Sequence, residues 1–354
     1  KYKKQVSYDQ GVTWYDVIPE EYVPSGTPIA YFDTLEECEA KKFILTLNDS
    51  SVVSAECDSS ISVTSGEVAS LYSETVKSAE IGICVTSIGY GAFGYCGSLT
   101  SVTIPTSVTN IGNYAFRSCS GLTSVNLPDS IQVINSDAFR DCTSLRNVTL
   151  GSGIRSIYNY VFYGCQNLTG LTIPSATTSI GSNILFSAPN NIESLSVDGR
   201  NTTYDSRNNC NAIIRKSDNT LLYGCKNTVI PSGVTTIGMN AFYGSTELVS
   251  VALPSGLTSI EKQAFMYCSG LTSVNIPNKV TNIERFAFGN CSSLNSAILP
   301  SRLTSINEFV FYGCTNLMSI DIPSGVTSIG NGAFWNCRSL TNVTIPNKVT
   351  TIGE

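Results

Sequence analysis

Apolar residues recur along the chain with a period of about 23 residues, and parts of each period alternate apolar with polar positions. The stretches VTSI (85–88) and LTSVTI (99–104) predict two short strands in one such period. Pro105 ends the second strand because proline offers no backbone donor to a ladder. Between the strands, GYGAFGYC (89–96) is too short and glycine-rich for a free helix and predicts one helical or 3₁₀ turn.

One period, which we call a rung, cannot bury its apolar face alone, whereas stacked rungs cover each other. The pattern therefore predicts a solenoid whose parallel strands lie about 4.8 Å apart. Full rungs start at Val85, Val108, Ile131, Ile154, Val234, Leu257, Val280, Leu303 and Val326, and a distorted rung starts at Thr177. Stacking in register predicts one internal column, the Phe column, made of Phe93, Phe116, Phe139, Phe162, Phe242, Phe265, Phe288, Phe311 and Phe334.

The amino-acid sequence of the rungs resembles that of a known repeat family. VTSIGYGAFGYCGSLTSVTIP (85–105) and VTSIGNGAFWNCRSLTNVTIP (326–346) are similar to the BspA-like leucine-rich repeats of surface proteins from anaerobic bacteria and some protozoa. The resemblance covers roughly residues 79–354. It implies a β-rich α/β solenoid, a curved right-handed array with a parallel sheet on its concave face. It also implies an extracellular or cell-surface location and an adhesive role toward host or matrix proteins.

The remaining segments divide the chain. Residues 1–45 do not fit the repeat and predict a small β module, in which SYDQGVTW (7–14) matches the Asp-box hairpin pattern. We expect residues 46–84 to cap the solenoid, since VKSAEIG (76–82) already resembles the second half of a rung. The solenoid itself is assigned to 85–354, with a hairpin inserted at about 198–230. A start without methionine and an end inside a rung predict a fragment of a longer protein.

The chain has 13 cysteines, and most of them share one repeat position. Neighbours in such a column lie about 4.8 Å apart with parallel side chains, whereas a disulfide needs Cβ atoms about 3.5–4.5 Å apart and facing each other. These cysteines therefore predict buried, reduced thiols. This Cys column contains Cys96, Cys119, Cys142, Cys165, Cys268, Cys291, Cys314 and Cys337.

Other cysteines lie outside the column. In the inserted hairpin, pairing Ile214 with Leu221 and Ile213 with Leu222 sets Cys210 opposite Cys225, where a disulfide could close. In the leading region, Cys38 and Cys57 are a possible pair, and Cys84 is left over.

Composition and charge narrow the function. The net charge of −6 and the pI near 4.9 argue against nucleic-acid binding, which needs a basic face. The absence of histidine removes the usual general base and the commonest metal ligand, so we expect no enzyme, no cofactor and no metal site. An oxygen-rich loop of Asp198, Asn201, Asp205 and Asn208 could hold calcium, although a solvated loop is the simpler interpretation. No apolar run reaches the length of a membrane span.

Two surfaces are candidates for ligand binding. Small polar residues point outward from the second strand of each rung, and the candidates among them are Asn126, Asn147, Asn275, Asp321 and Asn342. Large aromatic side chains share the position two residues before the Cys column, at Tyr163, Tyr243, Tyr312 and Trp335. The polar face is equally compatible with simple solubility, and the aromatic row with partial burial between neighbouring rungs.

These observations predict a monomeric, non-catalytic scaffold that is secreted or displayed on a cell surface. It would recognise a host protein, matrix protein or glycan through the solenoid surface. The alternative is a targeting or spacer segment of a larger surface enzyme that processes glycans.

Overall fold

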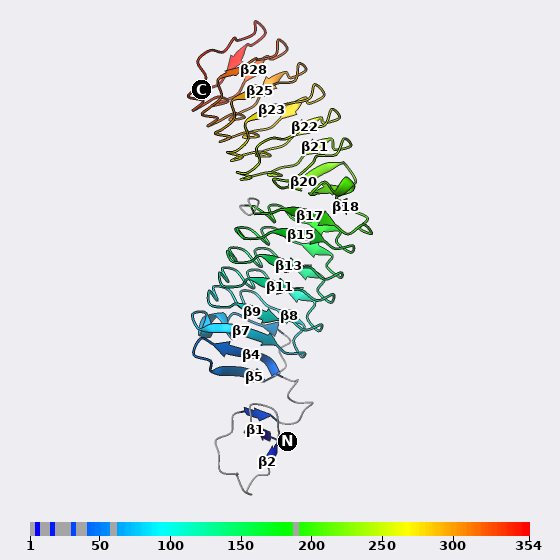
Figure 1. Ribbon diagram of the computed structural model, residues 1–354, viewed down its shortest axis with the longest axis vertical. Coiled ribbons are helices and arrows are strands. Elements are labelled where there is room, and N and C mark those ends of the chain that lie inside the picture. Colours follow the sequence, from blue (N-terminus) through cyan, green and yellow to red (C-terminus); the bar gives the residue numbers. More distant parts are fainter. Residues whose placement is uncertain (1–3, 8–14, 18–29, 33–40, 57–61, 187–190) are drawn as a thin grey trace.

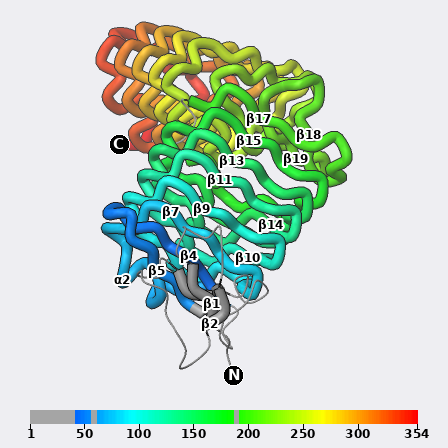
Figure 2. Tube along the Cα trace, turned by 60° about the horizontal axis from the view of Figure 1, so that its bottom comes forward, coloured from blue at the N-terminus to red at the C-terminus, as the bar shows by residue number. Residues whose placement is uncertain are grey.

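A computed structural model of the chain describes residues 4–7, 15–17, 30–32, 41–56, 62–186 and 191–354. Figure 1 shows the rungs stacked along one axis to form a rod, and Figure 2 shows them as successive loops of one continuous coil. The predicted solenoid is confirmed, and it consists of β strands and turns. The helical content of the described residues is α2 (Ala69–Tyr72) and the 3₁₀ turn η1 (Arg207–Asn209), so the α/β class is not confirmed.

The first strand of each rung adds to what we call the first ladder, and the pairs are parallel and in register, as between Ile111 and Ile134. Because each residue pairs with the one 23 positions later, every ladder position repeats the same chemistry. Upstream of the insertion the first ladder contains β6 (Ser62–Val63), β8 (Ser87–Ile88), β10 (Asn110–Ile111), β12 (Val133–Ile134), β14 (Ser156–Ile157) and β16 (Ser179–Ile180). Downstream it contains β21 (Thr236–Ile237), β22 (Ser259–Ile260), β24 (Asn282–Ile283), β26 (Ser305–Ile306), β28 (Ser328–Ile329) and β29 (Thr351–Ile352).

The second strand of each rung adds to the second ladder, which carries the outward polar residues. Most of its strands are longer than those of the first ladder, and its sheet is interrupted at several points, as the first ladder is at the insertion and between β24 and β26. It contains β7 (Val76–Ile81), β9 (Ser101–Thr103), β11 (Ser124–Asn126), β13 (Asn147–Thr149), β15 (Gly170–Ile173), β17 (Ser194–Val197), β23 (Ser273–Asn275), β25 (Ser296–Ile298) and β27 (Ser319–Ile320).

The N-terminal end of the solenoid is closed by an antiparallel hairpin. Strands β4 (Lys41–Leu47) and β5 (Val52–Glu56) pair with each other, and β4 pairs antiparallel with β7. Strand β4 crosses the expected boundary at residue 45. The amide of Ala69 donates to the carbonyl of Ala92, in the same way that each rung donates to the next. Cys84, left over in the sequence analysis, is disulfide-bonded, whereas Cys38 and Cys57 lie outside the described residues.

A separate three-stranded sheet lies in the leading region. It contains β1 (Lys4–Ser7), β2 (Tyr15–Val17) and β3 (Ala30–Phe32), in the order β2-β1-β3 and with antiparallel pairs. The two strands β1 and β2 flank the Asp-box stretch, of which residues 8–14 lie outside the described residues.

The stretch between the two strands of a rung is a hydrogen-bonded turn, not the helical turn that the sequence predicts. In the first full rung, Gly91 has φ +58° and Tyr95 has φ +63°, and such left-handed residues cannot continue a right-handed helix. The same two slots have positive φ in every rung where the structure describes them. We call the first the αL1 slot, just before the alanine of the Ala-Phe pair, and the second the αL2 slot, two residues after the phenylalanine.

The Cys column is confirmed, and the Phe column is confirmed within each half of the solenoid, since the insertion divides it between Phe162 and Phe242. Within each half, neighbouring rings are stacked with centroids 5.0–5.8 Å apart. The thiols of the Cys column are free and buried. From Cys119 onward each of these thiols also donates to the carbonyl oxygen of the phenylalanine in the preceding rung, for instance Cys119 Sγ to Phe93 O at 3.0 Å. The slot is therefore polar as well as small. Ser245 occupies it just after the insertion, and its buried Oγ has no hydrogen-bond partner.

The insertion is a hairpin of β19 (Ala212–Arg215) and β20 (Thr220–Gly224), flanked by β18 (Tyr204–Asp205). Ile214 pairs with Leu221 as predicted, but Ile213 pairs with Tyr223 because a bulge at Leu222 shifts the register. The predicted disulfide between Cys210 and Cys225 is therefore wrong, and both thiols are free. Their side chains are buried in two different apolar clusters, on opposite faces of the hairpin.

The hairpin divides the hydrophobic core in two. Ile213 and Tyr223 pack on the upstream cluster, while Ile214 and Leu221 pack on the downstream cluster. A Cβ on Gly224 would lie 2.2 Å from the ring of Phe242, so only glycine lets the downstream Phe column begin there. The hydroxyl of Tyr223 donates to Gly181 O at 2.7 Å and accepts from Ile184 N at 3.3 Å. It thereby satisfies backbone groups of the last upstream rung.

Candidate binding surface

The five polar candidates of the second ladder are all exposed, as predicted: Asn126, Asn147, Asn275, Asp321 and Asn342. They extend along one face of the solenoid and offer amide and carboxylate groups to solvent. Ile298, at the equivalent position between Asn275 and Asp321, is 62% exposed and interrupts the polar row. This face can form hydrogen bonds, but nothing in its geometry gathers the groups around one point.

The four aromatic candidates lie in one slot on the turn side of the rungs. Tyr163, Tyr243 and Tyr312 are half-buried, whereas Trp335 is 65% exposed. The structure surrounds them with further rings from the two αL slots, with Phe186 from their own slot and with Tyr90 from the position before the αL1 slot. We call this set the aromatic edge: Tyr90, Tyr95, Tyr114, Tyr160, Tyr163, Phe186, Tyr243, Tyr267, Phe286, Phe309, Tyr312 and Trp335.

The edge continues across the insertion. The ring of Phe186 stacks on Tyr163 with centroids 5.4 Å apart and on Tyr243 at 3.9 Å, although 57 residues separate Phe186 from Tyr243 in the sequence. Tyr267 then meets Tyr243 edge-on at 5.4 Å. The inserted hairpin thus leaves the turn side free, and the upstream and downstream rungs share one row of rings.

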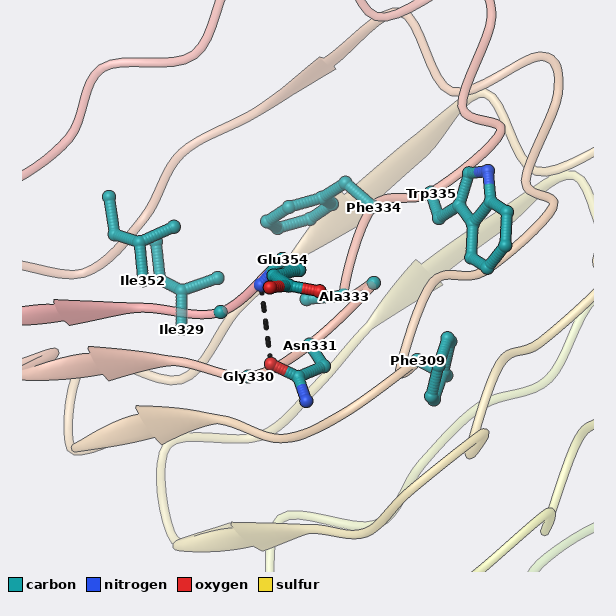
Figure 3. A pocket seen from close by; sticks show the side chains of 11 residues that line it. Phe309, Ile329, Gly330, Asn331, Ala333, Phe334, Trp335, Ile352 and Glu354 are labelled. Carbon is teal, nitrogen blue, oxygen red and sulfur yellow. Dashed lines mark hydrogen bonds between the residues drawn. The ribbon is translucent and has the colours of Figure 1, made fainter.

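A denser group of rings lies at the downstream end. Phe286 and Phe309 stack with centroids 4.8 Å apart, and Tyr312 approaches both of them edge-on at 6.0 Å. Trp335 lies 5.8 Å from Tyr312 and 6.3 Å from Phe309, and Figure 3 shows it beside Phe309 at the outer side of the last rung. Half-buried rings thus hold an exposed indole in place.

Many edge rings occupy left-handed backbone positions. Tyr114, Tyr160, Phe286 and Phe309 fill the αL1 slot with φ of 56–58°. Other rungs have glycine or asparagine there, except for Asp137 and Gln263. Tyr95 and Tyr267 fill the αL2 slot with φ of 63° and 62°. For a bulky residue this conformation costs about 1–2 kcal/mol, which glycine avoids and asparagine lowers. The backbone conformation of the αL slots therefore does not explain why aromatic residues occupy them.

Three arginines lie over edge rings in the part of the chain that the structure describes. The Arg140 guanidinium lies 4.4 Å from the Tyr163 ring centre, and Arg285 lies 4.9 Å from that of Phe286. Arg117 lies between two rings, 5.5 Å from Tyr95 and 5.3 Å from Tyr114. Cation–π contacts of this kind hold a long side chain flat on the surface.

A cavity of about 630 Å³ lies at the C-terminal face of the rod. Figure 3 shows Phe334, Ile329 and Ile352 around it, with Asn331 accepting a hydrogen bond from the amide of Glu354 at 3.2 Å. Its lining consists of the slots that pack against a following rung elsewhere in the rod. The cavity is therefore the face of the last stacked rung, and the charged residue in its lining is Glu354.

The described residues do not assemble a metal centre. Within them, no group of three or more Cys, Asp or Glu side chains could hold a metal ion. Arg200 pairs with Asp198 and Arg207 with Asp205, so the oxygen-rich loop is neutralised internally. Burial raises the pKa of the Cys96 thiol to about 12, which makes it unreactive at neutral pH. No helix among the described residues is long and apolar enough to cross a membrane.

Sequence reasoning found one slot of the edge, without Phe186 in it, and missed Tyr90 and the two αL slots. The αL slots were missed because tyrosine and phenylalanine do not indicate a left-handed backbone. Glycine and asparagine at the same slots of neighbouring rungs do indicate one. Comparing slot by slot, with Gly91 and Asn183 as the signal, would have revealed both rows.

Comparisons with known proteins agree with this architecture. A family model described as the BspA type leucine rich repeat region matches residues 71–213, 219–308 and 258–354, with 6 copies. A leucine rich cell surface protein from Faecalibacterium prausnitzii is similar in structure, with a TM-score of 0.58 and 27% identity over 93% of this chain and 96% of that one. The pneumococcal vaccine antigen PcpA shares the fold, with a TM-score of 0.60 and 20% identity over 88% of this chain and 73% of that one. A search of curated proteins gave no match.

Proposed function

The chain belongs to the BspA-type leucine-rich repeat family, and from this premise we propose that it is a non-catalytic binding scaffold of the bacterial cell surface that contacts its ligand through the aromatic edge. The similarity to a cell surface protein supports the location. The ligand is a host protein, a matrix protein or a glycan, and the chain acts as a monomer.

One observation carries the proposal. Six rings of the edge occupy left-handed positions that glycine would fill without strain and asparagine with less strain. Backbone strain that is accepted in six places where the side chain is an aromatic ring supports a role of these rings at the surface and not in folding. Tyr, Trp and Arg are also the residues that dominate binding energy at protein interfaces.

The polar face of the second ladder is the weaker candidate. Its outward residues are small, neutral apart from Asp321, and spread along the rod without a gathering point. Small polar side chains of this type keep a sheet face soluble and contribute little as anchors. We therefore assign to this face a secondary part in orienting a bound ligand.

Variants of the two surfaces test the proposal on arrays of glycans and matrix proteins. We expect Trp335→Ala combined with Tyr267→Gly to lower retention of the ligand at least about tenfold, because both remove exposed rings. The triple variant Asn126→Ala, Asn147→Ala and Asn275→Ala should change retention less. Met318→Ala, which removes a side chain 60% exposed outside the edge, is the matched control. Loss in the asparagine variant alone would assign binding to the sheet face and contradict the proposal.

A further inference from the structure

Arg117 differs from the other two arginines of the aromatic edge in having no acidic partner. Arg140 bonds to Asp137 at 2.9 Å and to Asp141 at 3.3 Å, and Arg285 lies 3.6 Å from Glu308. No ion pair or side-chain hydrogen bond of Arg117 exists among the described residues, and its buried Nε has no hydrogen-bond partner. Its charge is therefore fixed in place by two rings and neutralised by nothing that the structure describes.

The repeat explains how this difference arises. Arg117 and Arg140 occupy the same slot in successive rungs, one residue after the phenylalanine. The two residues that neutralise Arg140 are Asp137 and Asp141, and the equivalent slots beside Arg117 contain Tyr114 and Ser118. One rung thus supplies both carboxylates from its own chain, and the other supplies a ring and a hydroxyl. The Arg117 rung therefore has the same arginine position as the Arg140 rung but lacks both carboxylates.

The surroundings of Arg117 supply the rest of a binding site. Tyr95 and Tyr90 are 60% and 66% exposed, and Tyr90 meets Tyr114 edge-on at 5.4 Å. None of these three tyrosine hydroxyls has a hydrogen bond among the described residues. Tyr95 and Tyr114 are both held in the left-handed conformation, with φ of 63° and 58°. A guanidinium held by two rings therefore lies beside exposed tyrosines on the same part of the edge.

On the basis of the proposed function, we infer that Arg117 with Tyr95, Tyr114 and Tyr90 is the subsite for an acidic sugar of a glycan ligand, whose carboxylate contacts the terminal nitrogens of Arg117 as Asp137 contacts that of Arg140. Arginine binds a carboxylate through two parallel hydrogen bonds, which fixes its orientation. The sugar ring lies against an exposed tyrosine face and bonds to the hydroxyls.

A glycan fits this subsite better than an acidic peptide does. Peptide ligands obtain most of their affinity from apolar side chains that fill pockets. Neither the cavity of 160 Å³ at the insertion nor that of 630 Å³ at the C-terminal face has Arg117 or its three tyrosines in its lining. The Arg117 subsite instead offers flat, open ring faces beside polar groups. The net charge of −6 also disfavours a long polyanion and leaves a single carboxylate as the group recognised.

Calorimetric titration of the full chain tests the inference with a panel of acidic sugars: glucuronate, sialyllactose and an oligogalacturonate, each beside its neutral counterpart. We expect at least one acidic sugar to bind, and its neutral counterpart to bind at least about tenfold more weakly. Arg117→Gln should weaken binding by a similar factor. Arg302→Gln, which removes an exposed arginine that contacts no ring, should leave binding unchanged.

A second pair of variants separates binding from folding. Ser118→Asp recreates beside Arg117 the contact that Asp141 makes with Arg140, so it should fill the subsite from within and abolish binding while the protein stays folded. Ser118→Asn has the same shape without the charge and should retain binding. Asparagine and aspartate both tolerate the φ of +57° at this position.

Three results would overturn the inference: no acidic sugar of the panel binds, Arg117→Gln binds as the wild type does, or a tetra-aspartate peptide binds more tightly than every sugar. The proposed function fails separately. If the arrays show a ligand that the Trp335 and Tyr267 variant loses and Arg117→Gln keeps, the aromatic edge is confirmed and the subsite is rejected.

Discussion

The rungs upstream of the inserted hairpin and the rungs downstream of it have the same backbone and the same core, and they differ on the aromatic edge. Ring spacings in the Phe column are 5.1–5.7 Å upstream and 5.0–5.8 Å downstream. On the edge, the upstream half has tyrosines beside Arg117 and Arg140, while the downstream half has Phe286, Phe309 and Trp335. Core slots are fixed by packing, whereas edge slots vary and give each half its own chemistry.

The largest effect should come from the core and be equal in the two halves. Phe116→Ala upstream and Phe288→Ala downstream each remove one fully buried ring from between two others. We expect each to lower the free energy of unfolding by about 3–5 kcal/mol, measured by urea denaturation. A much larger loss in one half than in the other would show that the two cores are not equivalent.

The hairpin between the halves should be the next most sensitive region. Gly224→Ala places a Cβ where the Phe242 ring lies, so the ring must move, and we expect a loss of about 1–3 kcal/mol in the free energy of unfolding. Gly199→Ala is the control, since no atom lies within 4 Å of its added Cβ. A Gly224→Ala variant as stable as the control would mean that the downstream Phe column does not rest on the hairpin.

High pH should destabilise the protein through its buried thiols. Burial raises the pKa of Cys96 to about 12 and that of Cys337 to about 11, above the ordinary value of 9.0. The unfolded thiol loses its proton first, so the stabilisation is complete below pH 9 and is lost as the pH rises toward the folded pKa. For Cys96 the slope should approach about 1.4 kcal/mol per pH unit.

Urea denaturation of the wild type and of Cys96→Ala between neutral and alkaline pH measures this slope. The variant should lose stability less steeply above pH 9 because one ionising thiol is absent. Parallel curves for the two proteins would contradict the assignment of the effect to Cys96.

The smallest change in stability, and the most informative about the edge, should come from one slot compared between the halves. Tyr95→Gly and Tyr267→Gly both replace an αL2 tyrosine by a residue that adopts positive φ freely. We expect the free energy of unfolding to stay constant or rise by up to about 1 kcal/mol, since relief of strain offsets the lost ring contacts. A loss above 2 kcal/mol in either variant, measured by thermal denaturation, would make that ring a structural element.

The periodic part of the fold could be predicted from the sequence, and the local departures from it could not. The repeat predicts the two ladders, the Phe column and the reduced thiols, because identical residues at a fixed interval leave one way to bury them. The bulge at Leu222 has no such signal: shifting the hairpin by one residue separates Cys210 from Cys225 and reverses the disulfide prediction. Positive φ at Tyr95 is equally invisible in a tyrosine.

The candidate surface was predicted in part, for a related reason. Tyr163, Tyr243, Tyr312 and Trp335 share a slot and were found by alignment of the rungs. The special position of Arg117 depends on what its neighbours lack, and it appears only when Tyr114 and Ser118 are compared with the aspartates one rung later. This difference between the two rungs is present in the sequence. It becomes interpretable once the structure shows that Arg140 contacts both aspartates and that Arg117 contacts two tyrosine rings.

The ladder register, which pairs each residue with the one 23 positions later, also makes the rod divisible. Removing or duplicating one whole rung would rejoin both ladders without a mismatch. Each such step would change the separation between the upstream tyrosine–arginine contacts and the downstream indole by one strand spacing, about 4.8 Å. Gain or loss of whole repeats in the gene would therefore change the distance between two binding sites for one long ligand, and each site would stay intact.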